Sequence, residues 1–239
     1  MYDEFAHLWT LISAPEDYYA EAQVWKKTLR DRLGPGRRCL LELGVGGGNN
    51  LSHLTDEFDA TALDLFDKML DNSRRLNPGV EHIVGDMRTA RLGRTFDAVI
   101  AHDAISYMAT EADLLAAFRT AAAHLNPGGI FVTSPDYVQE SYQDGEVHHD
   151  TSTDGRITLT HIEYVYRLDP SDTQYHAAML YAIREGGTIR LEQDHHTFGL
   201  FPHRRWIELL DEAGFDTELV EYDVHDDQRQ SFLFVGTLR

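Results

Sequence analysis

The sequence predicts an α/β fold built around a doubly wound, mostly parallel sheet that carries a small antiparallel insertion. Three observations support this fold class. Short apolar runs alternate with amphipathic, helix-like segments through the first half of the chain, as they do in βαβ units. Acidic or glycine clusters follow these runs, at the positions where such strands end and ligands bind. Between residues 137 and 200 polar and apolar residues alternate instead, which is typical of antiparallel strands with one wet face.

The first expected element is an N-terminal helix. Ser13 is a suitable cap and Glu16 follows three residues later, in the spacing of a capping box. Gly34-Pro35-Gly36 would end the helix, because glycine and proline interrupt helical backbone. Its expected apolar face contains Tyr18, Ala22, Trp25 and Leu29.

The first strand, residues 38–43, leads into the glycine-rich run of residues 44–48. Glycines at such a turn allow positive φ angles and let a ligand lie against the main chain. Leu51, Leu54 and Phe58 recur at helical spacing, so a helix N-terminus with unpaired N–H groups is expected beside the turn. Strand, turn and helix together indicate a nucleotide-type pocket.

Further strands and helices alternate up to residue 133. Strands are expected at 60–63, ending at Asp64, at 81–84, ending at Gly85-Asp86-Met87, and at 96–101 and 130–133. One helix would carry Met69, Leu70, Ser73 and Leu76 and stop at Asn77-Pro78-Gly79. A second, at about 111–125, has Thr110 and Asp113 as a capping box.

The remaining segments divide the chain into a core and an insertion. Three extended segments are expected in the insertion, at residues 157–167, 175–184 and 188–198. A helix at about 203–213 and strands near 216–224 and 231–238 would complete a Rossmann-like sheet of seven strands. The expected division is a core of residues 1–136 and 201–239, with an antiparallel insertion at 137–200 covering the substrate site.

Composition limits the class of protein. A chain of 239 residues can bury a sizeable core, and no apolar run is long enough for a membrane span. The net charge of −19 argues against nucleic acid as a partner. Cys39, the single cysteine, excludes an internal disulfide, is expected in the core and fits a reducing cytoplasm. The expected partner is a small-molecule substrate, with a homodimer as a further option.

Four motifs, in this order and separation along the chain, resemble those of class I S-adenosylmethionine-dependent methyltransferases. They are Glu42-x-Gly44-x-Gly46-x-Gly48, Asp64 at the end of the second strand, Gly85-Asp86-Met87 after the third, and Asn126-Pro127-Gly128-Gly129 before the fifth. The N-terminal helix and the insertion look most like the small-molecule branch, which includes sugar N-methyltransferases and glycine N-methyltransferase. Residues 102–107, Asp194-x-His196 and Gly199-Leu200-Phe201-Pro202 resemble an actinobacterial subgroup. The resemblance implies S-adenosyl-L-methionine as cofactor and S-adenosyl-L-homocysteine as product.

The resemblance also implies roles for individual residues. Asp64 would accept hydrogen bonds from the ribose hydroxyls, and Asp86 would bind the adenine amino group. Either Tyr18 or Tyr19, with Trp9, would close over the cofactor carboxylate; Tyr18 shares a face with core residues, which favours Tyr19. Met69 fits equally well as plain core. The complete expected cofactor set is Tyr19, Glu42, Gly44, Gly46, Gly48, Asp64, Leu65, Met69, Asp86, Met87 and His102.

Catalytic candidates follow the fourth strand. His102 has a pKa suited to a general base, and Asp103 could orient it or hold a substrate amine. Neighbours in a strand point in opposite directions, so either of the two could face the pocket, with Tyr107 nearby. On the substrate side the candidates are His149, Glu163, His196 and Phe201. No metal is expected, because the clustered histidines lack a metal-ligand spacing.

The sequence is also compatible with two other functional classes. An NAD(P)-dependent oxidoreductase shares the strand-turn-helix opening, but Asn49 stands where its fingerprint has a third glycine. A non-catalytic S-adenosylmethionine-binding regulatory protein could use the same fold. The expected reaction is methyl transfer to a nitrogen or oxygen of a small molecule, in specialised metabolism, and the sequence does not distinguish the two atoms.

Overall fold

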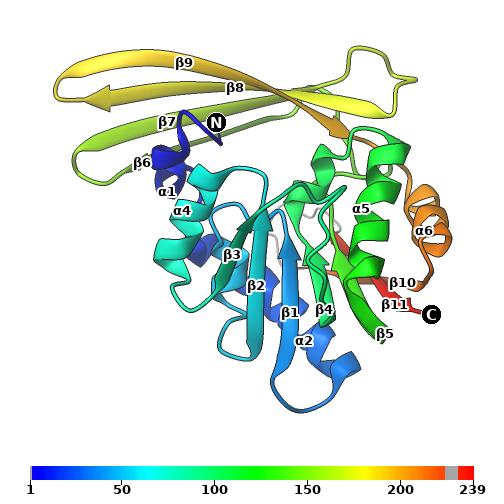
Figure 1. Ribbon diagram of the computed structural model, residues 1–239. Helices are drawn as coiled ribbons and strands as arrows, with labels where there is room; N and C mark the ends of the chain where they lie inside the picture. The colour runs from blue at the N-terminus through cyan, green and yellow to red at the C-terminus, as the bar shows by residue number, and fades with distance from the viewer. Residues whose placement is uncertain (1, 224–230) are drawn as a thin grey trace.

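The core of the protein is a seven-stranded sheet with strand order β10-β11-β5-β4-β1-β2-β3 (Figure 1). The computed structural model describes residues 2–223 and 231–239. Strands β1 to β5 pair in parallel, whereas β11 runs antiparallel to both β5 and β10. The strands are β1 Arg38–Leu43, β2 Phe58–Asp64, β3 Glu81–Val84, β4 Phe96–Ala101, β5 Leu125–Thr133, β10 Phe215–Tyr222 and β11 Ser231–Leu238. This arrangement confirms the predicted fold class.

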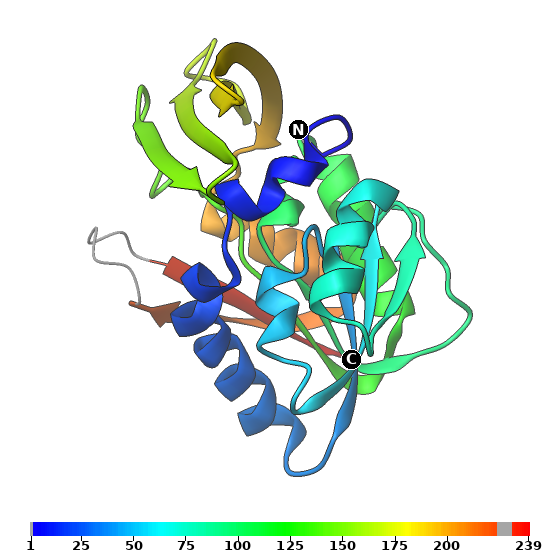
Figure 2. The same ribbon diagram turned by 90° about the vertical axis from the view of Figure 1, so that its left-hand side faces the viewer.

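Helices cover both faces of this sheet (Figure 2). On one face Trp25 and Leu29 of α2 pack with residues of α3 and α4, and on the other Phe118 of α5 packs against Trp206 of α6. Each face thus has its own buried cluster, as a doubly wound sheet requires. The helices are α2 Tyr19–Leu33, α3 Asn49–Ser52, α4 Asp67–Leu76, α5 Glu111–Ala123 and α6 His203–Glu212, with short turns η1 Ala6–Leu8, α1 Trp9–Ile12, η2 Pro15–Tyr18 and η3 Asp103–Tyr107.

A second, antiparallel sheet lies across the carboxyl ends of the parallel strands (Figure 1). It consists of β6 Val147–Thr153, β7 Ile157–Tyr166, β8 Gln174–Glu185 and β9 Thr188–Gly199. The prediction of three strands was therefore one short. Strand β6 was missed because it is an edge strand without an apolar face: none of its residues is buried. Phe5 and Leu8 of the N-terminal segment pack beneath this sheet against Ile157 and Tyr181.

Several local predictions were wrong for identifiable reasons. Cys39 is exposed rather than buried, since it lies near the start of β1, before the strand enters the core. Phe58 begins β2 instead of extending a helix, because α3 ends after a single turn at Ser52. Ser13 does not cap a helix: its hydroxyl pairs with the Tyr18 hydroxyl (2.9 Å), and the helical segment begins one residue later.

Other local predictions are confirmed. Thr110 Oγ1 accepts a hydrogen bond from the Asp113 amide at 3.1 Å and caps α5, and α2 ends at Gly34 with a φ of 71°. Within the described residues, no helix has the length and apolar character needed to cross a membrane.

Candidate active site

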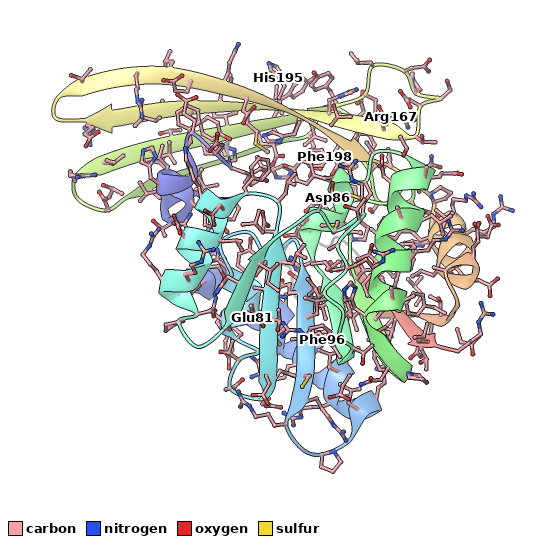
Figure 3. The ribbon with its side chains drawn as sticks, in the orientation of Figure 1. Glu81, Asp86, Phe96, Arg167, His195 and Phe198 are labelled. Carbon is pink, nitrogen blue, oxygen red and sulfur yellow. The ribbon has the colours of Figure 1, made fainter. Side chains whose placement is uncertain are left out.

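A cavity of about 1060 Å³ lies between the carboxyl ends of the parallel strands and the antiparallel sheet. Its floor comes from the turns that follow β1 to β5, and its roof from β7, β8 and β9. Figure 3 shows Asp86 below this space and Phe198 of β9 above it, whereas His195 points to the outer side of the sheet. Alternate residues of a strand face opposite sides, so Asp194, His196 and Phe198 line the cavity and His195 does not.

The glycine turn has three different structural roles. Gly46 (φ 55°) faces the cavity, where an added Cβ would meet nothing closer than Met69 Cε at 3.8 Å. At Gly44 (φ 76°) a Cβ would lie 2.4 Å from Ala104 Cβ, so this glycine permits η3 to pack against the turn. Gly48 lies outside the cavity wall, and a Cβ there would lie 2.4 Å from Ser73 Oγ. Of the three glycines, Gly46 therefore best fits the expected role of letting a ligand lie against the main chain.

Asp64 is placed to bind hydroxyl groups at the end of β2. Its Oδ2 accepts a hydrogen bond from the Gly46 amide (2.8 Å) and its Oδ1 from the Phe66 amide (2.9 Å). The side chain lines the cavity and is 7% exposed; burial raises the pKa of its carboxyl above the usual range. Two amides fix the carboxylate while its remaining lone pairs are available to a ligand.

Asp86 lies at the adjacent strand end and is held by a cation. Its Oδ2 is 2.6 Å from Arg88 Nη2, and Arg88 also reaches Asp113 at 3.0 Å. The Arg88 guanidinium holds the pKa of Asp86 below its usual range. Asp86 and Met87 both line the cavity, as do Leu65 and Met69. These positions form a pocket of the kind expected for an adenosine group.

Glu42 and Asn50 provide buried polar atoms without hydrogen-bond partners. Glu42 is 2% exposed, and its Oε2 has no partner among the described residues. Asn50 is 4% exposed and its side chain lies beside the Glu42 carboxylate, but neither its oxygen nor its nitrogen makes a hydrogen bond of good geometry among the described residues. Burial raises the pKa of Glu42 to about 8. Leaving buried polar atoms in a cavity wall without hydrogen bonds costs free energy unless a ligand supplies the missing partners. Both residues are therefore suited to bind the amine and carboxylate of an amino acid group.

Of the two adjacent tyrosines, Tyr18 faces the cavity, whereas the sequence favoured Tyr19 for this position. Tyr18 lines the cavity, with its ring 5.7 Å from the His102 ring, whereas Tyr19 is 59% exposed and packs against His53. Tyr18 does share a face with Trp25, as the spacing predicts, because both rings contact His102; this face meets the cavity, so the tyrosine assigned to the core lines the site. Trp9 also lines the cavity and covers Gly47.

His102 lies between two carboxylates. Its Nε2 is 3.1 Å from Glu21 Oε2 and its Nδ1 is 3.0 Å from Asp103 Oδ2. Burial alone would lower the pKa of His102, but the negative charges of Asp103 and Glu21 outweigh it and hold the pKa well above its usual range. A protonated imidazole has no lone pair to accept a proton. This arrangement does not support the expected role of His102 as general base.

Aromatic and acidic side chains line the upper half of the cavity. The Tyr107 hydroxyl donates to the Tyr2 hydroxyl (2.8 Å) and lies 2.9 Å from His196 Nδ1. Of the four expected substrate-side residues, Glu163 and His196 line the cavity, whereas His149 is exposed on β6 and Phe201 is buried in the core. His149 was misplaced because the strand alternation turns His148 inward in its place.

Sequence reasoning missed Tyr2, Glu21, Asn50 and Asp136, which all line the cavity. Asp136 could have been found, because it closely follows the carboxyl end of β5, where ligands of such sheets bind. Glu21 lies one helical turn from Tyr18, but nothing local indicates that it faces His102. Among the described residues, no group of three histidine, cysteine or acidic side chains could hold a metal ion.

Comparison with known proteins identifies the family. The family described as "Methyltransferase domain" matches residues 40–129. The dTDP-3-amino-3,4,6-trideoxy-alpha-D-glucopyranose N,N-dimethyltransferase of Streptomyces venezuelae is 34% identical over 209 residues, which cover 86% of each chain. The chain belongs to the S-adenosylmethionine-dependent methyltransferases.

Solved structures of relatives agree with this assignment. The methyltransferase resembles the sugar N-methyltransferase KedS8 from Streptoalloteichus sp., with a TM-score of 0.84, 30% identity and coverage of 95% and 90% of the two chains. It also resembles S-adenosylmethionine-bound CalS10, an amino pentose methyltransferase from Micromonospora echinaspora, with a TM-score of 0.78, 28% identity and coverage of 93% and 92%.

The methyltransferase therefore uses S-adenosylmethionine and transfers its methyl group to a small molecule. The oxidoreductase and the non-catalytic regulator are both set aside. The lower half of the cavity fits the cofactor on structural grounds, since Asp64, Gly46 and the unsatisfied atoms of Glu42 and Asn50 lie together there. That leaves the upper half of the cavity, beneath β7 to β9, for an acceptor, and we call it the acceptor half.

Proposed function

We propose that the enzyme methylates the nitrogen of an amino sugar. The observation that carries this proposal is a group of three carboxylates in the acceptor half of the cavity: Asp103 after β4, Asp136 after β5 and Glu163 on β7. A protonated amine is the complementary ligand for such a wall. The names of the relatives are consistent with it, since the Streptomyces venezuelae enzyme is an amino sugar N,N-dimethyltransferase.

The electrostatics of Asp136 support a cationic acceptor. The Asp136 residue is exposed to the cavity rather than buried in the core, and desolvation by the surrounding protein together with the negative charges of Asp103 and Glu163 raises the pKa of its carboxyl above the usual range. An ammonium group between these carboxylates relieves their repulsion. At 4 Å and an effective dielectric constant of 20, each contact of this kind contributes about 4 kcal/mol before desolvation.

Aromatic side chains complete the acceptor site. Tyr107, Tyr175 and Phe198 form a cluster, with ring centroids 4.6 Å apart for Tyr107 and Phe198 and 4.9 Å apart for Tyr175 and Phe198. All three line the cavity. Flat apolar surfaces of this type pack against the C–H face of a sugar ring, while the carboxylates hold its amine.

The chain's own residues contribute binding, orientation and proton transfer. S-adenosylmethionine supplies a methyl group already activated by the sulfonium, so the acceptor nitrogen forms the new C–N bond as the C–S bond breaks and its electron pair stays on sulfur. Asp103 orients the amine. The ammonium must lose one proton before its nitrogen has a lone pair, and Asp136, whose pKa is raised, accepts that proton.

The direct test is methyl transfer to matched acceptors. We expect product with 3-amino- and 4-amino-deoxyhexoses, presented both as nucleotide conjugates and as glycosides, and none with the corresponding hydroxyl sugars. Mass spectrometry counts the methyl groups, and ¹³C-methyl labelling with NMR locates them on nitrogen or oxygen. Methylation only at oxygen would overturn the proposal.

A pair of isosteric variants tests the acidic wall. We expect Asp136→Asn to reduce kcat/KM for the amine about tenfold to hundredfold, because it removes a charge that contacts the substrate. The matched control Asp172→Asn lies on the exposed turn between β7 and β8 and should leave activity unchanged. Equal activity of Asp136→Asn and the wild type would contradict the role of this carboxylate.

We propose that residues 137–200 act as the part that covers the acceptor, which their separate sheet over the cavity supports. A homodimer could cover the outer face of that sheet, where Ile162, Leu180 and Leu191 are exposed. Light scattering of the wild type and of Leu180→Asp tests the dimer. The cytoplasmic location stays a prediction.

A further inference from the structure

Glu21 is a buried carboxylate that the mechanism above does not use. It lies in the first turn of α2, and its side chain is only 13% exposed. Three polar groups from different elements converge on it. The Tyr222 hydroxyl from β10 and Trp25 Nε1 (3.4 Å) donate hydrogen bonds to it, and His102 Nε2 lies 3.1 Å from Glu21 Oε2 as an ion-pair partner without hydrogen-bond geometry. Burying a charged side chain is unfavourable unless its partners compensate. A carboxylate held in this way needs an explanation.

The contacts of His102 extend this network to the acceptor. The ring is 6% exposed and is fixed by Trp25 and Tyr18, at centroid distances of 5.1 Å and 5.7 Å. Each of its two nitrogens lies about one hydrogen-bond length from a carboxylate, that of Glu21 on one side and that of Asp103 on the other. Both nitrogens can donate only when the imidazole is protonated. The geometry therefore couples Glu21 to Asp103 through a charged ring.

Asp103 depends on this contact for its orientation. Its side chain is 45% exposed to the cavity, so without a partner it could occupy several rotamers. His102 Nδ1 lies 3.0 Å from one carboxylate oxygen, Asp103 Oδ2, which leaves the other oxygen to a ligand. A neutral ring would lose the positive charge that attracts both carboxylates.

We propose that Glu21 is a positioning residue, whose carboxylate keeps the His102 ring positively charged so that the ring holds Asp103 toward the acceptor amine. This inference rests on the proposed function of Asp103. Glu21 itself does not need to touch the substrate. It acts through His102, from a helix far from β4 in the sequence, and thereby links helix α2 to the acceptor half of the site.

The pH behaviour follows from the charges around the ring. Facing His102, directly or through one residue, are Glu21 of α2, Asp103 of η3, Glu42 of β1, Asp136 after β5, Tyr18 of η2 and Tyr222 of β10. The carboxylates among them favour the charged ring. Removing the charge of Glu21 lowers the pKa of His102, and the ring then becomes neutral as the pH rises through this lower value.

The test is Glu21→Gln, which keeps the shape and a hydrogen-bond acceptor but removes the charge. We expect kcat with an amino sugar acceptor to fall about tenfold to hundredfold, as a misaligned reacting group does. S-adenosylmethionine affinity, measured by calorimetry, should change less than about threefold. The kcat of the variant should also fall as the pH rises, over a pH range in which the kcat of the wild type stays constant. Asp31→Asn, an exposed position on the same helix, is the matched control.

Nuclear magnetic resonance of ¹⁵N-labelled histidine separates this role from a purely structural one. At pH 8 we expect His102 to carry two protons in the wild type and one in Glu21→Gln. An unchanged protonation state, or an unchanged pH profile in a folded variant, would overturn the inference. A different result would refute the proposed function: the wild type would methylate no amine, whatever the protonation state of His102.

Discussion

The clearest quantitative prediction concerns Gly44, where the first residue of the turn touches η3. The change Gly44→Ala places a Cβ 2.4 Å from Ala104 Cβ and 2.7 Å from Met87 Cε, at a φ of 76°. The positive φ disfavours alanine by about 1–2 kcal/mol. Forcing an atom into packed space adds about 1–3 kcal/mol. We therefore expect the free energy of unfolding to fall by about 2–5 kcal/mol.

Gly128→Ala separates the two contributions to this loss. Gly128 has the same φ of 76°, but an added Cβ would meet nothing within 4 Å. This variant should lose only the conformational part, about 1–2 kcal/mol. The difference between the two variants then measures the steric contact of Gly44 with Ala104 and Met87.

Urea denaturation followed by circular dichroism is the appropriate assay, with the slope checked for constancy between variants. Gly44→Ala should also lower activity, since Ala104 follows Asp103 directly and a shift of η3 would move that carboxylate. Equal stabilities for the two variants would refute the reasoning, because the contact would then relax without loss.

Three further predictions concern the cavity. Asp64→Asn should weaken S-adenosylmethionine binding about tenfold to hundredfold, because a charged acceptor of ribose hydroxyls is lost; unchanged affinity by calorimetry would exclude that role. Burial raises the pKa of Glu42 to about 8, so the free energy of unfolding of the ligand-free protein should fall as the pH rises from about 4.5 to 8. Glu42→Gln should abolish this dependence on pH, and its free energy of unfolding at pH 8 should exceed that of the wild type by about 1–3 kcal/mol. Urea unfolding of both proteins at pH 5.5 and 8 measures this pH dependence, and the same dependence in Glu42→Gln would show that other groups cause it. Tyr107→Phe breaks the contact with Tyr2 and should raise KM for the acceptor a few-fold, whereas Tyr142→Phe, whose hydroxyl bonds exposed Asp144, should not.

The residues that line the lower half of the cavity were largely predictable because their signals are local. Gly46 and Asp64 each lie at the end of a strand, and parallel strands bring their carboxyl ends to one edge. The choice between the two tyrosines needed the fold: periodicity correctly puts Tyr18 on the face of Trp25, but only the tertiary structure shows that this face meets His102 at the cavity. The polar edge strand β6 has no apolar alternation, so no pattern could identify it.

The amino-acid sequence by itself determined the order of the elements, the glycine turn and the methyl donor that the turn and Asp64 indicate. These depend on backbone preferences and on spacings within a few residues. Only the tertiary structure decided which carboxylates meet in the acceptor half and that His102 lies between Glu21 and Asp103. Such contacts join segments far apart in the chain, and their charges take effect only where folding removes water from between them.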